Sequence, residues 1–185
     1  GDYTLIVTNV PYLGRKSHDD LLRGWGDLNE KDAKSDLATM FVSRSLSRLA
    51  RNGSMAVVTP QGWLLLTTYR KMRERLLRHC TWNAVSRLGP GAFETIGGHV
   101  VNVALTILTA GVPPKGAVIG GVEASDAKSP AEKATLLRDG PIALVPQAEQ
   151  LENPDATISL QSNAGRTYLR EYAGCSQGLS TGDDL

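Results

Sequence analysis

The chain has 185 residues, of which 41% are apolar and 21% charged; this suits one domain, or one domain and part of another, and excludes a disordered chain. Residues 1–112 carry 14 Lys and Arg against 9 Asp and Glu (+5), and residues 113–185 carry 6 against 10 (−4), so the first part is the expected partner for phosphates. No apolar run is long enough to cross a bilayer, no signal-like segment follows Gly1, and Cys80 and Cys175 lack metal-ligand spacing, so we expect a cytoplasmic protein without a membrane span or a metal site.

Strands and helices are predicted to alternate along the first part of the chain. Residues 3–8 form the first predicted strand, and the polar stretch 14–33 is a predicted loop. Ser35 is the expected cap of a helix over residues 36–51 with an inward face that includes Phe41. The elements predicted after this helix are strands at 55–59, 82–88 and 100–109 and a helix at 63–79, whose basic side chains are taken as a solvated face.

The dipeptide Pro113-Pro114 marks a predicted boundary, after which the elements are shorter. Ser129 and Glu132 form a capping box that opens a helix ending at Arg138. The other elements predicted in this part are strands at 141–145 and 157–160, a helical turn at 147–151 and a helix at 165–172. The alternation as a whole predicts an α/β fold with a parallel sheet covered by helices on both faces, followed by a small α+β segment.

The tetrapeptide Asn9-Val10-Pro11-Tyr12 directly follows the first predicted strand. An exocyclic amino nitrogen is a poor nucleophile because its lone pair is delocalised into the ring. The Asn9 side-chain oxygen and the Val10 carbonyl, which Pro11 would help to aim, can accept the amino hydrogens and free that lone pair. Tyr12 would stack on the base, which must leave a duplex to reach such a pocket. An ordinary turn is the alternative for the tetrapeptide alone.

Several ordered blocks resemble the adenine-specific DNA methyltransferases of BREX/Pgl phage defence, whose class carries the motif Asn/Asp/Ser-Pro-Pro-Tyr/Phe. The blocks are Thr8 to Tyr12, Asp36-Leu37-Ala38-Thr39, Val58-Thr59-Pro60-Gln61-Gly62-Trp63, Leu88-Gly89-Pro90-Gly91-Ala92-Phe93-Glu94 and Gly178-Leu179-Ser180-Thr181-Gly182-Asp183. Val10 departs from the motif, but the family uses only the main-chain carbonyl at that position.

The resemblance implies a partial Rossmann-like methyltransferase sheet, strands four to seven, in residues 1–112, and the start of a target-recognition region in residues 113–185. The motifs that hold S-adenosylmethionine in the family lie on the first strands and do not occur in this sequence, so we expect the chain alone to bind this cofactor poorly.

The resemblance, the residues after a strand at the open end of the sheet and the local charge together suggest site residues. Phe93 is a second candidate for stacking on the base, with simple core packing as the alternative. Asp36 and Gln61 are candidates for lining the pocket, although Asp36 also suits a helix start. Arg15 and Lys16 are candidate contacts to DNA.

The implied partners are double-stranded DNA and other phage-defence proteins, and the exposed first strand predicts self-association along its edge. Two alternatives remain open. One is a methyltransferase acting on RNA or protein glutamine, and the other is a noncatalytic module for DNA binding or assembly.

Overall fold

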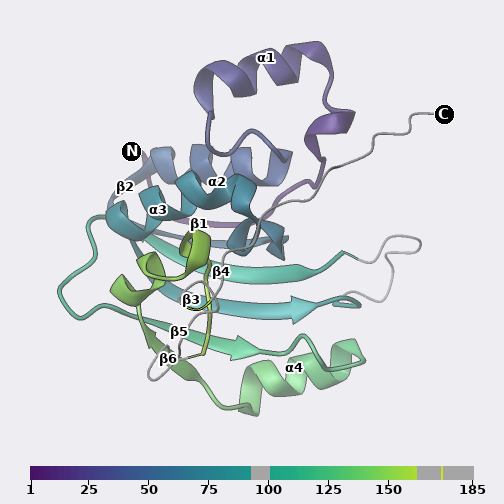
Figure 1. Ribbon diagram of the computed structural model, residues 1–185, viewed down its shortest axis with the longest axis vertical. Coiled ribbons are helices and arrows are strands. Elements are labelled where there is room, and N and C mark those ends of the chain that lie inside the picture. The colour runs from purple at the N-terminus through teal and green to yellow at the C-terminus, as the bar shows by residue number, and fades with distance from the viewer. Residues whose placement is uncertain (93–100, 162–171, 173–185) are drawn as a thin grey trace.

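The computed structural model describes residues 1–92, 101–161 and 172, and its centre is a six-stranded sheet in the order β1-β2-β4-β3-β5-β6 (Figure 1). The strands are β1 (Tyr3–Asn9), β2 (Leu49–Pro60), β3 (Cys80–Gly89), β4 (Val103–Ala110), β5 (Val118–Glu123) and β6 (Ala143–Pro146). β1 pairs with β2, and β3 with β5, in parallel, whereas all other neighbours are antiparallel. The predicted parallel sheet is therefore wrong: the sheet is mixed. β4 follows β3 as its direct neighbour and starts opposite the end of β3, so it returns antiparallel.

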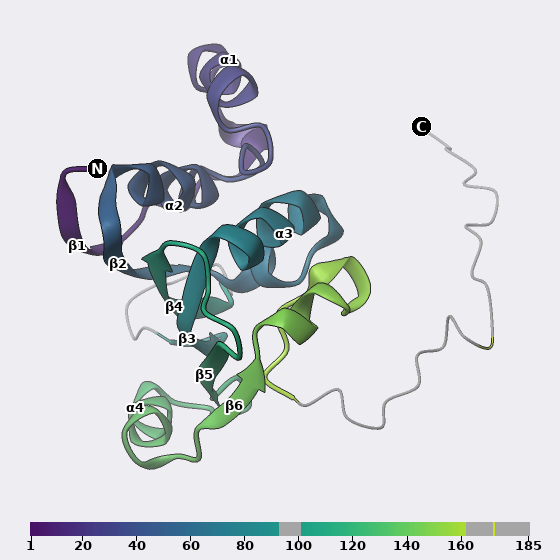
Figure 2. The same ribbon diagram turned by 90° about the vertical axis from the view of Figure 1, so that its left-hand side faces the viewer.

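One face of the sheet is covered by helices α2 (Leu37–Arg48) and α3 (Arg70–His79) (Figure 2). Alternate residues of β2, including Met55 and Val57, are buried on this face. Leu108 and Trp82 lie beside them on β4 and β3, because β4 pairs with both strands. Since side chains alternate across a strand, this pattern places the main core between the sheet and the two helices.

Within the described residues, the opposite face is covered at one end only. Helix α4 (Pro130–Asp139) packs there through Leu136 against a small cluster that includes Leu88 and Val103. Among the described residues this face stays open at its other end, where Val7 of β1 and Ile107 of β4 flank the same β2 residue and are 73% and 40% exposed. Helices therefore lie on both faces, as predicted, but they cover the two faces unequally.

The predicted loop over residues 14–33 is wrong, because this segment contains η1 (Arg15–Ser17) and helix α1 (Asp20–Asn29). The Asp19 carboxylate caps α1 by accepting from the Leu22 backbone N–H at 2.7 Å. Glycine disfavours a helix interior by about 1 kcal/mol, but Gly26 lets α1 approach α2, since a Cβ at this position would lie 2.9 Å from the Met40 sulfur.

Asp36, not the predicted Ser35, caps α2, because its carboxylate accepts from the Ala38 backbone N–H at 2.8 Å. The helix ends at Arg48, and the chain passes directly into β2. Phe41, predicted to point inward, is instead on the exposed side of α2.

The single helix predicted over residues 63–79 is broken into three pieces: η2 (Gln61–Leu64), η3 (Thr67–Tyr69) and α3. Arg73 on α3 was predicted to be solvated but is fully buried. Its position beside Met72, one turn before Leu76 and Leu77, puts it on the inward side of the helix.

The second part of the chain continues the same sheet, because β5 pairs with β3 and β6 pairs with β5. The predicted capping of α4 is confirmed: Ser129 accepts from the Glu132 backbone N–H at 3.2 Å. Also on α4, buried Lys133 donates to the carbonyls of Leu88, Ala124 and Ala127 at 2.6, 3.1 and 2.7 Å.

Beyond β6 the chain forms η4 (Ala148–Leu151), as predicted for residues 147–151, and η5 (Pro154–Ala156). Residues 157–160 pair with no strand of the described sheet, so the strand predicted there is wrong. Instead, the Ile158 backbone N–H donates to the Leu64 carbonyl at 3.0 Å, which draws this segment to the end of η2. The helix predicted at 165–172 falls outside the described residues except for Tyr172. In the part that is described, no helix has the length and apolar character to cross a membrane.

Candidate functional site

The tetrapeptide Asn9-Val10-Pro11-Tyr12 lies at the carboxyl end of β1. Asn9 is the last residue of the strand, pairs with Val58 of β2 and has an exposed side chain. Val10 is buried, and Tyr12 is half-buried with its hydroxyl donating to Asn9 Oδ1 at 3.5 Å. The motif therefore faces outward at the edge of the sheet where ligands of α/β folds bind.

The chain after the motif turns back beside the start of α2. Leu13 accepts from the Leu37 backbone N–H at 2.9 Å, and Gly14 and Asp36 form an isolated antiparallel bridge. These main-chain bonds bring Tyr12 and Asp36 together although they are far apart in the sequence. The predicted site residues Asn9, Tyr12 and Asp36 are thus gathered at one edge of the sheet.

Two phenols share the field of Asp36. Burial, and then the Asp36 carboxylate, raise the pKa of Tyr12 above its ordinary value. The same two causes raise the pKa of Tyr69, partly offset by a hydrogen bond with Thr39. Both phenols are therefore neutral at physiological pH and can donate hydrogen bonds.

A cavity of about 200 Å³, called the α2 pocket below, lies between the start of α2 and the residues after β2. It is lined by Asp36, Ala38, Thr39, Pro60, Gly62, Trp63, Leu66 and Tyr69. Trp63 is fixed by donating its indole N–H to Thr59 Oγ1 at 2.9 Å. Aromatic walls with one carboxylate and two hydroxyl groups suit a flat, mainly apolar ligand that carries a few polar groups.

Gln61 is buried next to this pocket but is not one of its lining residues. Its backbone N–H donates to the Asn102 carbonyl at 2.7 Å, which ties the end of β2 to the residue before β4. Gln61 Oε1 is buried and has no hydrogen-bond partner in the described part of the chain.

The two predicted DNA contacts differ in their surroundings. Arg15 donates twice to the Asp27 carboxylate, at 2.8 and 3.1 Å, and Lys34 pairs with the same carboxylate at 2.8 Å. Hydrogen bonds from these two cations lower the pKa of Asp27. Lys16 is exposed. Arg15 therefore serves at least in part to hold α1, whereas Lys16 is accessible to a partner.

Phe93, the second stacking candidate, lies outside the described residues. Tyr69 and Thr39 of the α2 pocket were not singled out by the sequence as site residues. Thr39 ends the block Asp36-Leu37-Ala38-Thr39, and this block could have identified it as a site residue. Tyr69 precedes a helix and belongs to no such block.

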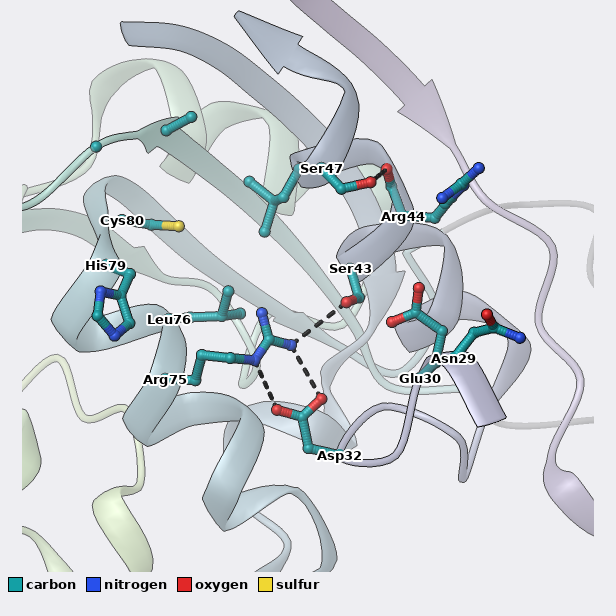
Figure 3. A pocket seen from close by; sticks show the side chains of 13 residues that line it. Asn29, Glu30, Asp32, Ser43, Arg44, Ser47, Arg75, Leu76, His79 and Cys80 are labelled. Atoms are coloured by element: carbon teal, nitrogen blue, oxygen red, sulfur yellow. Dashed lines mark hydrogen bonds and ion pairs between the residues drawn. The ribbon is translucent and has the colours of Figure 1, made fainter. Parts of the chain in front are cut away.

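A larger cavity of about 570 Å³ lies between α2 and α3 and reaches His79 and Cys80, where β3 begins (Figure 3). Arg75 crosses it, donating to the Asp32 carboxylate at 2.7 and 2.9 Å and to Ser43 Oγ at 3.3 Å. Cys80 is a buried free thiol whose pKa is raised by burial. Because β3 and β1 start at the same end of the sheet, this cavity lies away from Asn9, and we assign the candidate site to the motif and the α2 pocket.

Within the described ranges, no three His, Cys, Asp or Glu side chains come together as a metal site. The candidate site is thus made of amide, phenol, carboxylate and aromatic groups. Such groups bind and orient a ligand through hydrogen bonds and stacking.

The fold is similar to part of the fold of class I S-adenosylmethionine-dependent methyltransferases, as the predicted Rossmann-like sheet implied. A methyltransferase subunit of a type I restriction-modification system from Streptococcus thermophilus superposes with a TM-score of 0.55 at 18% identity, covering 84% of this chain and 37% of that one. A putative class I methyltransferase from Listeria monocytogenes gives 0.51 at 14% identity, covering 83% and 43%. At these identities the likeness concerns the fold alone.

Sequence relatives narrow the class. Residues 1–92 match the family of Eco57I restriction-modification methylases. The chain is 35% identical over 106 residues to the adenine-specific methyltransferase BrxX of Escherichia coli O9:H4 (strain HS), and 35% over 101 residues to PglX of Lacticaseibacillus casei (strain Zhang). These matches cover 57% and 54% of this chain but only 9% and 8% of the relatives. The chain is thus similar in sequence to the BREX/Pgl adenine-specific methyltransferases, as its motifs predicted.

Proposed function

We propose that the chain is a catalytic part of a DNA adenine-N6 methyltransferase that acts in phage defence. The observation that supports this function is the outward-facing Asn9-Val10-Pro11-Tyr12 at the carboxyl end of β1, beside Asp36 and the α2 pocket. The sequence similarity of the chain to BrxX and PglX further supports adenine as the methyl acceptor.

In this proposal Asn9 prepares the nucleophile. Its side-chain oxygen and the Val10 carbonyl accept the two hydrogens of the adenine amino group, which draws the nitrogen toward a tetrahedral geometry and localises its lone pair. The nitrogen then forms a bond to the methyl carbon and loses one proton to solvent. No covalent enzyme intermediate is needed.

Tyr12 holds the base. A duplex adenine must rotate out of its stack at a cost of a few kcal/mol, and stacking on an aromatic ring offsets part of that cost. The half-buried ring and its contact with Asn9 Oδ1 keep the stacking surface beside the acceptor oxygen. Phe93 remains our candidate for the second face of the base.

The residues present fit part of an S-adenosylmethionine site. The α2 pocket offers aromatic walls, the Asp36 carboxylate and Thr39, which suit an adenosyl group. S-adenosylmethionine would supply an electrophilic methyl group whose carbon–sulfur bonding pair stays on sulfur. Residues outside this chain would complete the binding of the cofactor in the whole protein.

Lys16, and in part Arg15, would contact duplex DNA, and residues 113–185 would begin the target-recognition region although β5 and β6 continue the catalytic sheet. We place the protein in the cytoplasm, with other phage-defence proteins as partners. The open edge of β1 would support self-association.

The test is product identification with the whole protein that contains this chain. Incubation with duplex DNA and methyl-labelled S-adenosylmethionine should yield labelled N6-methyladenine after digestion to nucleosides. Label in RNA or in protein glutamine instead would favour the second candidate, and DNA binding without transfer would favour a noncatalytic module.

A further inference from the structure

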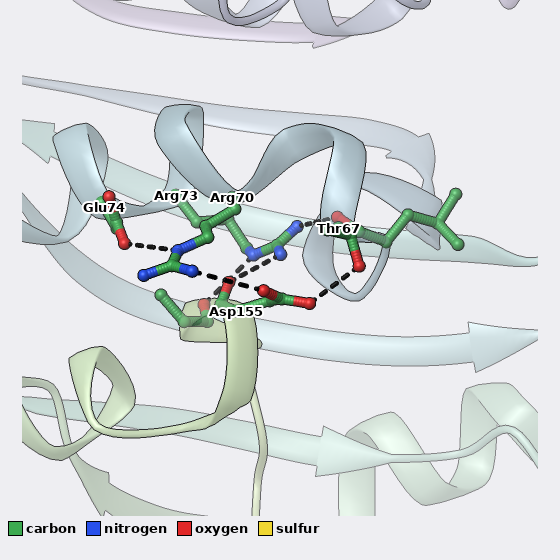
Figure 4. Close-up of polar contacts among 7 residues, drawn as sticks. Thr67, Arg70, Arg73, Glu74 and Asp155 are labelled. Atoms are coloured by element: carbon green, nitrogen blue, oxygen red, sulfur yellow. Dashed lines mark hydrogen bonds and ion pairs between the residues drawn. The ribbon is translucent and has the colours of Figure 1, made fainter. Parts of the chain in front are cut away.

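Arg73 is the most deeply buried charged side chain of the described structure, with no exposed surface, and its guanidinium reaches main-chain carbonyls of two separate segments (Figure 4). Nη1 donates to the carbonyls of Trp63 and Leu66 at 2.6 and 2.8 Å. Nη2 donates to the Asp155 carbonyl at 2.8 Å, and Nε donates to the Ala156 carbonyl at 3.1 Å. One side chain thus joins the segment after β2 to the segment after η4.

Four of the five guanidinium N–H groups are used on neutral carbonyls. Burial lowers the pKa of Arg73 to about 10, so it remains charged at neutral pH. Lysine has three donors on a single nitrogen and cannot reproduce this planar fork. Position 73 therefore requires arginine, whereas an ordinary core-facing helix position accepts any apolar residue of suitable size.

The first segment held by Arg73 is a wall of the α2 pocket. Trp63 and Leu66, whose carbonyls accept from Arg73, line that pocket together with Gly62 and Tyr69. This wall is made of the short helices η2 and η3, which have few internal hydrogen bonds to hold them in place.

The second segment is a strained turn. Asp155 and Ala156 have φ values of 54° and 51°, in the left-handed region that residues other than glycine rarely adopt. The Asp155 carboxylate accepts from Thr67 Oγ1 at 2.7 Å and lies 3.6 Å from Arg70 Nη1. Such strain persists only where the surroundings impose it, and Arg73 and Thr67 impose it here.

We propose that Arg73 is a positioning residue that sets the shape of the α2 pocket by clamping its wall to the 154–158 turn. The pocket would then be shaped by residues 154–158 as well as by the catalytic strands. This inference rests on the proposed function in one respect: the pocket takes an adenine ring, which belongs either to the cofactor or to the extruded base.

The experiment compares Arg73→Met, Arg73→Lys and Thr67→Val in the whole protein, with Arg78→Met, an exposed arginine of the same helix, as the matched control. Thr67→Val removes one surface hydrogen bond between the two segments and leaves Arg73 in place. This variant therefore tests the link between the segments even if Arg73→Met fails to fold. Amide hydrogen exchange is followed in residues 61–68, in residues 153–158 and in β2 and β3. KM and kcat are measured separately for cofactor and for DNA.

We expect faster exchange in residues 61–68 and 153–158 together, with β2 and β3 unchanged, and kcat/KM lower by roughly 10- to 100-fold in Arg73→Met. Arg73→Lys should recover little of this loss, Thr67→Val should show a smaller effect in the same two segments, and Arg78→Met should show none. A higher KM for cofactor would identify the adenosyl group as the occupant, and a higher KM for DNA would identify the base.

Exchange that rises throughout the sheet, or a kcat/KM unchanged in folded Arg73→Met, would overturn the inference because Arg73 would then serve stability alone. A wild-type protein that transfers no methyl group would refute the proposed function instead. In that case, hydrogen exchange in residues 61–68 and 153–158 would still test whether Arg73 holds the two segments together.

Discussion

Replacing Asn9 by alanine should lower the rate of methyl transfer without lowering the stability of the fold. The Asn9 side chain is exposed, and the one hydrogen bond it makes among the described residues is the long 3.5 Å contact from Tyr12. Surface substitutions of this kind change the free energy of unfolding by no more than about 0.5 kcal/mol. The Tm of Asn9→Ala should therefore stay close to that of the wild type.

Methyl transfer should respond differently. Asn9 supplies one of two acceptors for the adenine amino group, and removal of one preorganised hydrogen-bonding group from a reacting centre costs about 100- to 1000-fold in kcat. Asn9→Asp keeps an acceptor oxygen and should retain more activity than Asn9→Ala. Asn83→Ala, on β3, is the matched control and should leave kcat unchanged.

The assay is single-turnover transfer of labelled methyl to duplex DNA by the whole protein, alongside thermal unfolding followed by circular dichroism. Near-normal kcat in a folded Asn9→Ala protein would refute the assignment of the acceptor. A fall in Tm that matches the fall in activity would show instead that Asn9 is needed for folding.

Four further predictions follow from contacts described above. Tyr12→Ala should lower methyl transfer sharply and Tyr12→Phe only slightly, because phenylalanine keeps the stacking face; equal losses in both would point to the hydroxyl. Burial and Asp36 raise the pKa of Tyr69 in the folded protein. The neutral Tyr69 phenol therefore contributes fully to stability below its ordinary pKa of 10.0, and this contribution is lost as the pH rises through the folded pKa. The Tm of the wild type should fall more steeply than that of Tyr69→Phe above about pH 10, and parallel curves of Tm against pH would contradict this. Lys133→Met should lower the free energy of unfolding by about 1–3 kcal/mol in urea titration, since three carbonyls lose their donor; Lys128→Met, outside that cluster, is the control, and an equal loss there would count against it. Val7→Lys should reduce concentration-dependent self-association in sedimentation experiments, and an unchanged profile would exclude pairing through β1.

Local signals in the sequence located most elements. Strand 3–8 and the Ser129 cap were predictable because alternation and capping depend on neighbouring residues. Helix α1 was missed because two glycines weaken its local preference, whereas the contact that favours it, between Gly26 and Met40, is tertiary. The cap of α2 was assigned one residue too early because Ser35 and Asp36 are equally suitable by type.

The candidate site was predictable only in part. Asn9, Tyr12 and Asp36 were identified from their blocks, and the structure brings them together at one edge of the sheet. The burial of Arg73 could have been suspected from its place among Met72 and Leu76. Its four acceptors could not, because they are main-chain carbonyls, which every residue type carries. The direction of β4 likewise depends on pairing between distant segments.

The place of β4 between β2 and β3 sets an order of events during biosynthesis. β2 and β3 are not bonded to each other, and both pair with β4, whose pairing with β2 joins Ser54 to Thr109; the other edge of β3 pairs with β5. A nascent chain that has left the ribosome only as far as β3 therefore carries three strand edges that only later strands can pair, one on β2 and both on β3. Because such edges attract other chains, the chain is vulnerable to aggregation until residue 110 is translated, when β4 can pair two of the three edges at once.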